Sequence, residues 1–262
     1  MAMTAYNPYY SLVGLLVGML VGMTGVGGGS LMTPLLVLLF NFHPATAVGT
    51  DLLYASITKT VGTFVHGQRR TVDWRIVGRL ASGSLPAAAL TLFGISRLGS
   101  LDDGTAGLLS AMLGGALVLT SMTIIFRPQI MAWAEPRMRG LDARRISLLT
   151  VLTGIILGVL VSITSVGAGA LGVTALLMLY PKLPVARIAG TDIAHAVPLT
   201  LVAGLGHLWM GSFDLGLMLA LLVGSIPGII IGSMVGSRSS DQVLRPVLAA
   251  VLLVVGGRLL LG

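Results

Sequence analysis

The sequence predicts an all-α integral membrane protein built from two copies of one helical unit, and three observations support this. Of the 262 residues, 55% are hydrophobic and only 10% are charged, and the mean hydropathy is +0.97. The apolar segments are about 20 residues long, as a membrane helix requires, and lack the polar–apolar alternation of barrel strands. A pattern of glycine, proline, aspartate and histidine residues also occurs twice in the same order.

Eight apolar segments form two sets of four, one on each side of a basic stretch. They cover residues 11–41, 46–66, 76–96, 105–126, 146–180, 189–211, 215–236 and 243–261. This order predicts a first transmembrane repeat over residues 1–126, a basic cytoplasmic linker over 127–145 and a second transmembrane repeat over 146–262.

The two sets align residue by residue, which indicates a tandem duplication. An offset of 140 pairs the glycine-rich stretch Thr24–Leu31 with Thr164–Leu171. After one inserted residue, an offset of 141 pairs further residues of the two sets. These pairs are Gly49-Thr50-Asp51 with Gly190-Thr191-Asp192, His66 with His207, Asp73 with Asp214, and Gly83-Ser84-x-Pro86 with Gly224-Ser225-x-Pro227.

Loop charge decides how the repeats are oriented. If each glycine-rich segment crosses the membrane once, the repeats are parallel and basic loops fall on both sides. If it enters and returns as a hairpin with arms of about 13 residues, the repeats are inverted and most basic loops share one side. The positive-inside rule therefore predicts six spanning helices, two re-entrant hairpins and an inverted repeat.

The net charge of +7 belongs to these loops and does not indicate a nucleic-acid partner. The chain has no cysteine, which excludes disulfides and thiolate metal sites. No Lys or Arg precedes the first apolar segment, so we expect that segment to stay in the mature protein. The predicted localisation is the plasma (inner) membrane, with the lipid bilayer as a partner.

The glycine-rich stretches interrupt apolar runs that are longer than one helix needs. A helix that resumes after such a break directs its first N–H groups, and the positive end of its dipole, toward the break. This arrangement predicts an anion site, although the glycines could instead serve only close packing. No lysine follows Gly29, so the stretch is not a phosphate-binding P-loop. The candidate ligands from both copies are Thr24, Gly27, Gly28, Gly29, Ser30, Thr164, Gly167 and Gly169.

The repeated Gly-Thr-Asp tripeptide opens an apolar segment in each copy. Thr50 and Thr191 are candidate anion ligands, and Asp51 and Asp192 are candidate proton carriers, because a carboxylate inside a membrane is costly and commonly functional. The alternative is that Thr or Asp only caps the helix.

Lys59 is the only charged residue well inside an apolar segment, and its counterpart in the second copy is Thr200. It is a candidate substrate ligand, or else a lysine that extends to the membrane surface.

Three histidines, His66, His195 and His207, are candidates for proton coupling because histidine titrates near neutral pH. The alternative is an ordinary hydrogen-bonding role at a helix end. No metal site or cofactor is expected, because the histidines do not form an i,i+4 pair with a carboxylate between them.

Small residues recur every four positions and predict close helix packing. These stripes are Gly14, Gly18 and Gly22; Gly107, Ala111 and Gly115; and Gly224, Gly228, Gly232 and Gly236.

The chain resembles the TauE/SafE family of membrane transporters, of the sulfite exporter or 4-toluene sulfonate uptake type. The resemblance rests on the glycine-rich opening from Gly14 to Ser30, on Gly49-Thr50-Asp51, on the basic stretch after His66 and on the echo of these motifs in the second half. It covers nearly the whole chain. It implies a substrate that is a small sulfur-containing or carboxylate anion.

These observations predict a secondary transporter rather than an enzyme. No nucleotide-binding motif is present, so the energy for transport must come from an ion or substrate gradient. Protons are the candidate coupling ion, and the oligomeric state, including a homo-oligomer, is left open. The alternatives are a passive anion channel and an intramembrane hydrolase with Ser30 as nucleophile.

Overall fold

The computed structural model describes residues 8–24, 29–68, 70–97, 103–138, 140–236 and 241–261, and their regular elements are all helices. This confirms the all-α prediction. The helices are α1 Pro8–Thr24, α2 Gly29–Phe40, α3 Pro44–Gln68, α4 Trp74–Arg97, α5 Asp103–Ile125, α6 Arg127–Met138, α7 Ala143–Thr164, α8 Ala170–Leu179, α9 Val185–Trp209, α10 Leu215–Gly236 and α11 Asp241–Leu261.

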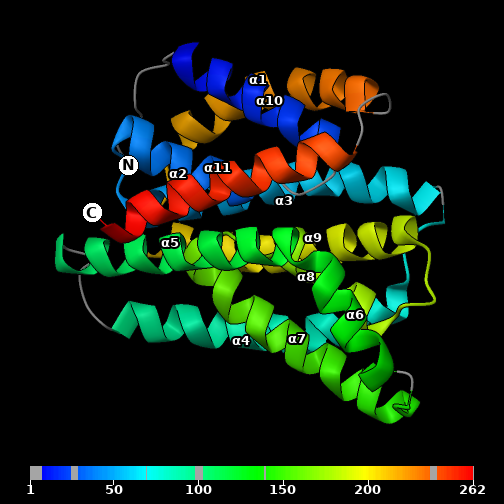
Figure 1. Ribbon diagram of the computed structural model, residues 1–262. Helices are drawn as coiled ribbons and strands as arrows, with labels where there is room; N and C mark the ends of the chain where they lie inside the picture. Colours follow the sequence, from blue (N-terminus) through cyan, green and yellow to red (C-terminus); the bar gives the residue numbers. More distant parts are fainter. Residues whose placement is uncertain are drawn as a thin grey trace.

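The two halves of the chain have the same order of helices. In α1–α5 and again in α7–α11, a long helix is followed by a short one and then by three long ones (Figure 1). Helix α6 lies between the halves, where the sequence predicts only a linker. Its side chains support each other at helical spacing, since the Arg137 guanidinium stacks over the Trp133 ring at 4.0 Å.

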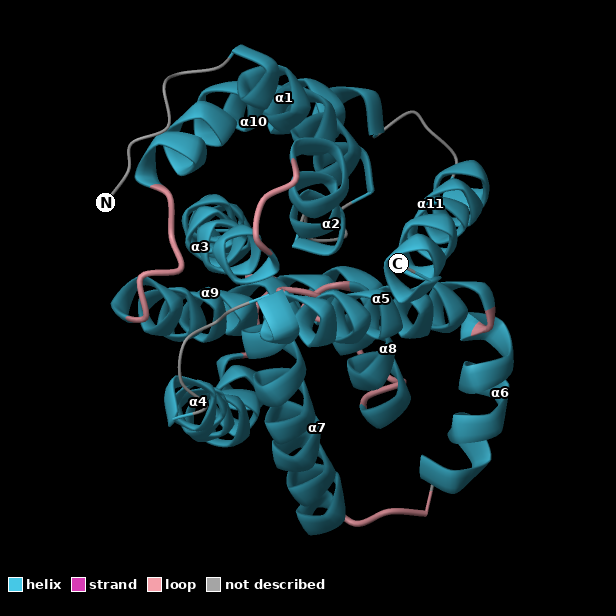
Figure 2. Cartoon of the chain, turned by 90° about the vertical axis from the view of Figure 1, so that its left-hand side faces the viewer, coloured by secondary structure: helices cyan, strands magenta, loops and turns pink. Residues whose placement is uncertain are grey.

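Helices from one half pack against helices from the other. The first helix of each half packs along the fourth helix of the other half, which gives the pairs α1 with α10 and α7 with α4. Helix α3 packs along its counterpart α9, and α5 along its counterpart α11. In Figure 2, α3 and α9 lie between the α1–α10 pair and the α4–α7 pair.

Helices α3 and α9 run antiparallel. A Cβ atom added to Gly49, near the start of α3, would lie 2.6 Å from Cβ of His207 in the last turn of α9. One added to Gly190, near the start of α9, would lie 3.0 Å from Nδ1 of His66 in the last turn of α3. The Gly-Thr-Asp start of each helix therefore meets the histidine-bearing end of its counterpart.

Glycines allow the closest helix approaches, as predicted for the described members of two of the three small-residue stripes; the surroundings of Gly22 and Gly236 lie outside the described residues. Added Cβ atoms on Gly14 and Gly18 of α1 would overlap the backbone of α10, and those on Gly224, Gly228 and Gly232 of α10 would overlap the backbone of α1. The pair α4–α7 has the same arrangement. Added Cβ atoms on Gly154 and Gly158 of α7 would overlap carbonyl oxygens of Leu80 and Ser84.

The prediction for the third stripe is wrong. Added Cβ atoms on Gly107 and Gly115 would have no neighbour within 4 Å, whereas one on Gly114 would lie 2.8 Å from the carbonyl oxygen of Gly256. Helix α5 therefore turns a different face toward α11 from the one that the spacing suggested.

Five helices of the described part of the chain are long and apolar enough to cross a membrane. They lie at Trp74–Arg97, Ala106–Ile125, Ala143–Thr164, Val185–Trp209 and Leu215–Gly232. This set differs from the six predicted spanning segments, because it includes α7 and lacks α3 and α11. The 22-residue α7 precedes the 10-residue α8, so the predicted arm length of about 13 residues is wrong for the second half, while the re-entrant path stays a prediction. Helix α7 begins earlier than predicted because Asp142 caps it and accepts a hydrogen bond from the Arg145 N–H.

Candidate functional site

The second glycine-rich stretch forms a sharp turn between α7 and α8. Ser165 ends α7 in the left-handed conformation, with φ 59° and ψ 1°, and its N–H donates to the Val161 carbonyl oxygen at 2.8 Å. Gly167 and Gly169 follow with φ of 126° and 124°, which residues with a Cβ rarely adopt. The glycines at these two positions therefore form the break itself.

Thr164, a predicted ligand, stabilises this turn. Its Oγ1 donates to the Leu160 carbonyl oxygen at 2.7 Å and accepts from the Val166 N–H at 3.1 Å. Of the first-half ligands, Gly27 and Gly28 and the side chains of Thr24 and Ser30 lie outside the described residues, and Gly29 is the first residue of α2. Their role as ligands stays a prediction.

Asp192 from α9 lies at the N-terminus of α8. Its side chain is buried and accepts a hydrogen bond from the backbone N–H of Gly169. A Cβ atom on Gly172, in the first turn of α8, would overlap Asp192 Oδ1. Absence of a side chain at Gly172 thus lets the carboxylate approach the helix end, where the helix dipole favours a negative charge.

Asp51 from α3 is fully buried and joins both halves. Its Oδ2 accepts hydrogen bonds from Thr33 Oγ1 of α2 at 2.5 Å and from Ser165 Oγ at the second break at 2.9 Å. One oxygen of each aspartate, Asp51 Oδ1 and Asp192 Oδ1, is buried without a hydrogen-bond partner. Such atoms are rare in proteins and need an explanation.

Asp192 and Asp51 both attract the ammonium group of Lys59 electrostatically. The side chain is 9% exposed, and its Nζ donates to the Ala168 carbonyl oxygen at 3.4 Å. Lys59 therefore points toward the second break rather than toward the membrane surface. We refer to Asp51, Lys59 and Asp192 as the acid–lysine cluster.

His195, one turn after Asp192, has a serine partner. Its Nε2 lies 2.8 Å from Ser84 Oγ of α4, and its Nδ1 is buried without a partner. Ser84 belongs to the repeated Gly-Ser-x-Pro motif, which could have identified it from the sequence, whereas nothing in the sequence singled out Thr33.

The other two histidines lie at helix ends. His207 Nε2 donates to the Ser162 carbonyl oxygen of α7 at 2.8 Å, and His66 Nδ1 lies 2.8 Å from Thr71 Oγ1. His66 follows Asp51 by 15 residues on one helix, which places them roughly 22 Å apart along the axis.

Thr50 and Thr191 connect the halves in a reciprocal way. Thr50 Oγ1 accepts from the Asp214 N–H at 3.1 Å, and Thr191 Oγ1 accepts from the Asp73 N–H at 2.9 Å. Both aspartates in turn cap a helix, Asp73 at α4 and Asp214 at α10. The repeated tripeptide thus holds the start of the fourth helix of the other half.

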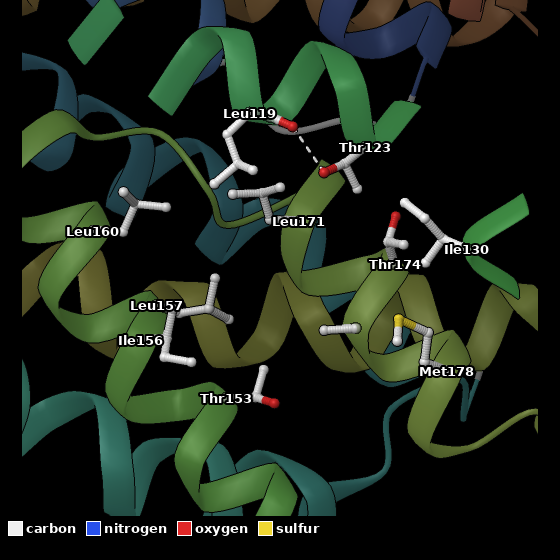
Figure 3. Close-up of a pocket in the computed structure, with 11 residues that line it drawn as sticks. Leu119, Thr123, Ile130, Thr153, Ile156, Leu157, Leu160, Leu171, Thr174 and Met178 are labelled. Carbon is white, nitrogen blue, oxygen red and sulfur yellow. Dashed lines mark hydrogen bonds between the residues drawn. The ribbon is translucent and has the colours of Figure 1, made fainter. Parts of the chain in front are cut away.

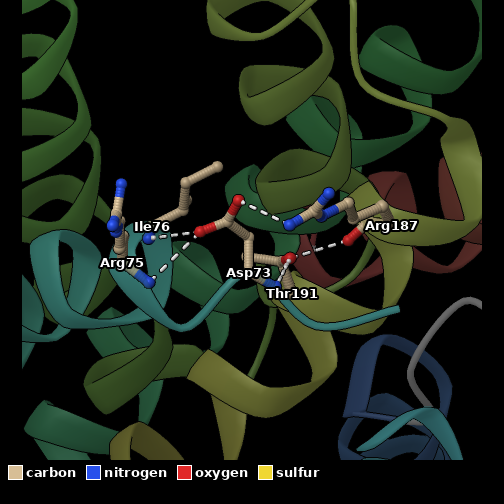
Figure 4. Close-up of polar contacts among 5 residues, drawn as sticks. All are labelled: Asp73, Arg75, Ile76, Arg187 and Thr191. Carbon is tan, nitrogen blue, oxygen red and sulfur yellow. Dashed lines mark hydrogen bonds and ion pairs between the residues drawn. The ribbon is translucent and has the colours of Figure 1, made fainter. Parts of the chain in front are cut away.

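An ion pair adds to the connection between Thr191 and Asp73. Asp73 Oδ2 lies 3.3 Å from Arg187 Nη2 (Figure 4). The Thr191 hydroxyl also donates to the Arg187 carbonyl oxygen at 2.7 Å. Arg187 corresponds to Thr46 in the first half, so the arginine of this ion pair is not itself repeated.

Replacing Thr50 by valine is expected to destabilise the protein, by about 1–3 kcal/mol, because the buried Asp214 N–H would lose its acceptor. Thermal unfolding of the detergent-solubilised protein measures the change. Thr50→Ser keeps the hydroxyl and serves as the control. Equal melting temperatures for the valine and serine variants would contradict the role of this hydrogen bond.

A separate cavity of about 280 Å³ lies between α5, α6, α7 and α8 (Figure 3). Its lining is mainly apolar, with Leu157 and Leu171 among the contributing side chains. The Thr123 hydroxyl at its edge donates to its own helix, at the Leu119 carbonyl oxygen. An apolar cavity does not suit an anion, and no member of the acid–lysine cluster lines it.

Apolar helices that can cross a bilayer, packed around buried charged side chains, define a multi-pass membrane protein of the transporter class. Comparison with known families agrees. The family described as Sulfite exporter TauE/SafE matches residues 10–259, and this chain belongs to that family. The resemblance inferred from the glycine-rich motifs and the predicted plasma-membrane localisation are confirmed.

The chain is also similar to curated proteins along most of its length. It is 39% identical to the probable membrane transporter protein YjnA of Bacillus subtilis, over 95% of this chain and 98% of that protein. It is 28% identical to the probable membrane transporter protein YdhB of the same organism, over 82% and 84% of the two chains. Identity to the probable membrane transporter protein MJ0441 of Methanocaldococcus jannaschii is 25%, over 95% and 93%. No solved structure matches this chain.

Proposed function

We propose that this chain is a secondary transporter that moves a small sulfur-containing or carboxylate anion, of the sulfite or organosulfonate type, across the plasma membrane. The observation that carries the proposal is the acid–lysine cluster beside the second helix break. Buried charges inside a membrane are costly, and in transporters they commonly mark the pathway of the substrate or the coupling ion. Family membership supports the same substrate class.

The anion binds between Lys59 and the N-terminus of α8 in this proposal. Lys59 supplies a positive charge at the break, and the first N–H groups of α8 supply aligned dipoles. Gly167 and Gly169 give the backbone the conformation that exposes these groups. The corresponding first-half ligands are Thr24, Gly27, Gly28, Gly29 and Ser30. Thr50, Thr164 and Thr191 contribute to the proposed site by holding the backbone around it, because the Thr164 and Thr191 hydroxyl groups already donate to the Leu160 and Arg187 carbonyl oxygens.

Transport proceeds by alternating access of two inverted repeats, each with one re-entrant, glycine-broken segment. The antiparallel packing of α3 on α9 supports the inversion, because equivalent helices of parallel repeats would run in the same direction. The first helix of each half packs on the fourth helix of the other half, so the two repeats meet along extended surfaces that are lined by glycines. Such surfaces suit a rocking motion of one repeat against the other.

Protons drive the transport in this proposal. Asp51 and Asp192 each have a buried carboxylate oxygen that is free to carry a proton, and both lie near Lys59. His195 lies one turn from Asp192, with an unpaired Nδ1. His66 and His207, at the helix ends, complete the candidates for a proton path.

A flux assay tests the proposed function. The purified protein in proteoliposomes is expected to give saturable uptake of at least one member of a panel of sulfite, organosulfonates and small carboxylates. A pH gradient is expected to accelerate that uptake, whereas a gradient of equal size but opposite sign is expected to slow it. Liposomes without protein provide the control, and absence of saturable flux for every anion would overturn the proposal.

The alternatives make different predictions in the same assay. A passive anion channel would conduct without saturation and without acceleration by a pH gradient. A hydrolase would release a product and would lose that activity on Ser30→Ala. Ser84 and His195 lie within hydrogen-bond distance, but both are buried and the unpaired His195 Nδ1 lacks the third group that orients a catalytic base.

A further inference from the structure

We propose that Asp192 is a built-in competitor of the transported anion. Its carboxylate occupies the anion site in the empty protein, and one proton must neutralise it for each anion that binds. This inference rests on the proposed function and explains how proton and anion could be coupled at a single place. It concerns Asp192 alone and assigns no such role to its counterpart Asp51.

The first support is the place of the carboxylate. Asp192 lies where an anion is expected, against the first turn of α8, and accepts from the Gly169 N–H. The side chain is 1% exposed, and Oδ1 has no hydrogen-bond partner. A carboxylate that served only as a helix cap would be expected to use both oxygens or to reach water. The unpaired oxygen is instead available for a proton.

The second support is Lys59, which attracts Asp192 and donates to the carbonyl oxygen of Ala168 in the same break. The ammonium group and the end of α8 therefore both act on this one carboxylate. An incoming anion needs the same two partners. Two negative charges beside one lysine in a buried site would repel each other strongly, so the anion and the ionised Asp192 exclude each other.

The asymmetry of the halves supports the choice of Asp192 over Asp51. Asp51 Oδ2 accepts from two hydroxyl groups, those of Thr33 and Ser165, which fix it in place. Asp192 has only a backbone N–H and the lysine as partners. Its carboxylate is therefore the one that an anion can replace without leaving hydroxyl groups unpaired.

Few other titratable groups face Asp192. In the part of the chain that the structure describes, α3 contributes Lys59 and, beside Gly190, His66, and His195 lies on α9 itself. From α4 the nearby side chain is Ser84, which lies 2.8 Å from His195 Nε2. Asp73 and Arg187, near the start of α9, form an ion pair with each other. Helix α8 offers backbone groups only.

The test measures proton uptake on anion binding. Methanesulfonate is the probe, because its own charge does not change in the pH range used. Isothermal titration calorimetry of the purified full chain, in two buffers with different heats of protonation, gives the number of protons bound per anion. The wild type is expected to take up about one proton per anion and to lose affinity about tenfold per pH unit as the pH rises.

Two variants of the site and one control sharpen the test. Asp192→Asn removes the charge and is expected to bind methanesulfonate without proton uptake and with a pH-independent affinity. Gly172→Ala keeps the charge but pushes the carboxylate off α8, because only the flexible end of Asp192 is in the way. It is expected to weaken the pH dependence. Asp73→Asn is a matched acid-to-amide change outside the cluster and is expected to bind like the wild type.

The outcomes separate this inference from the proposed function. Binding to the wild type without proton uptake, or unchanged proton uptake in Asp192→Asn, would overturn the inference and leave the transporter in place. If methanesulfonate and the rest of the anion panel bind neither the wild type nor Asp192→Asn, the proposed function fails and the inference fails with it.

Discussion

Replacing Lys59 by methionine is expected to reduce saturable anion flux by about a hundredfold or more. Methionine keeps the length and apolar stem of the side chain but removes the charge that faces the second break. Removing one partner of a buried, hydrogen-bonded charge pair across a binding interface commonly costs about 2–5 kcal/mol, which corresponds to roughly 30-fold to several-thousandfold in binding. Initial rates of uptake into proteoliposomes, at matched protein content, measure the effect.

The duplicated sequence offers a matched control for this experiment. Thr200 is the counterpart of Lys59 in the second half, and it is also buried. Its hydroxyl donates only within its own helix, to the Ala196 and Val197 carbonyl oxygens. Thr200→Val is therefore expected to retain the wild-type flux within about twofold, since such internal hydrogen bonds contribute little.

Loss of folding must be separated from loss of transport. Size-exclusion profiles and melting temperatures of the solubilised variants provide that check. If Lys59→Met is monodisperse and still transports at near the wild-type rate, Lys59 has no role in anion binding. The lysine would then serve only to compensate the two buried aspartates.

The cluster itself could be predicted because each of its members is exceptional in the sequence. Asp51 and Asp192 recur in a repeated tripeptide, and Lys59 is a lone charge in an apolar segment. Nothing in the sequence could indicate that α3 and α9 run side by side and bring these residues to one break. That depends on pairing between helices about 140 positions apart in the chain.

The repeated threonines show a limit of motif reasoning. Thr50 and Thr191 were correctly recognised as a pair, but their hydroxyl groups hold the N–H of Asp214 and Asp73 across the two halves. The competing capping explanation assumed that such residues act on their own helix. Here they act on a loop of the other half, because the inter-half packing brings each tripeptide to the start of a fourth helix.

Glycine spacing predicted close packing but not always the correct face. The period of four residues identifies a stripe, and every helix surface has several possible stripes. For α1 and α10 only one stripe was glycine-rich, so the prediction held. In α5 two adjacent glycines, Gly114 and Gly115, belong to different stripes, and the structure places Gly114 against α11.

Gly83→Leu is expected to have the largest effect on folding of any single change considered. A Cβ atom at this position would overlap the Val151 carbonyl oxygen and lie 3.0 Å from the Ile155 nitrogen of α7. Both are backbone atoms, so no side-chain movement can relieve the clash and α4 must separate from α7. Overpacking of this kind costs about 1–3 kcal/mol even where side chains can adjust, and backbone separation is expected to cost more.

Gly78→Leu, on the same helix, is the matched control for that change. A Cβ atom at Gly78 would have no neighbour within 4 Å, and leucine has a better helix propensity than glycine, by somewhat less than about 1 kcal/mol. At Gly78, leucine is therefore expected to leave the melting temperature unchanged or to raise it. At Gly83, five residues further along α4, the same substitution is expected to abolish a monodisperse product.

Since Ser84 follows Gly83 and pairs with His195, separation of α4 from α7 would also disturb the serine that lies next to the acid–lysine cluster. Comparable melting temperatures for the two leucine variants would show that the α4–α7 contact does not depend on the missing side chain.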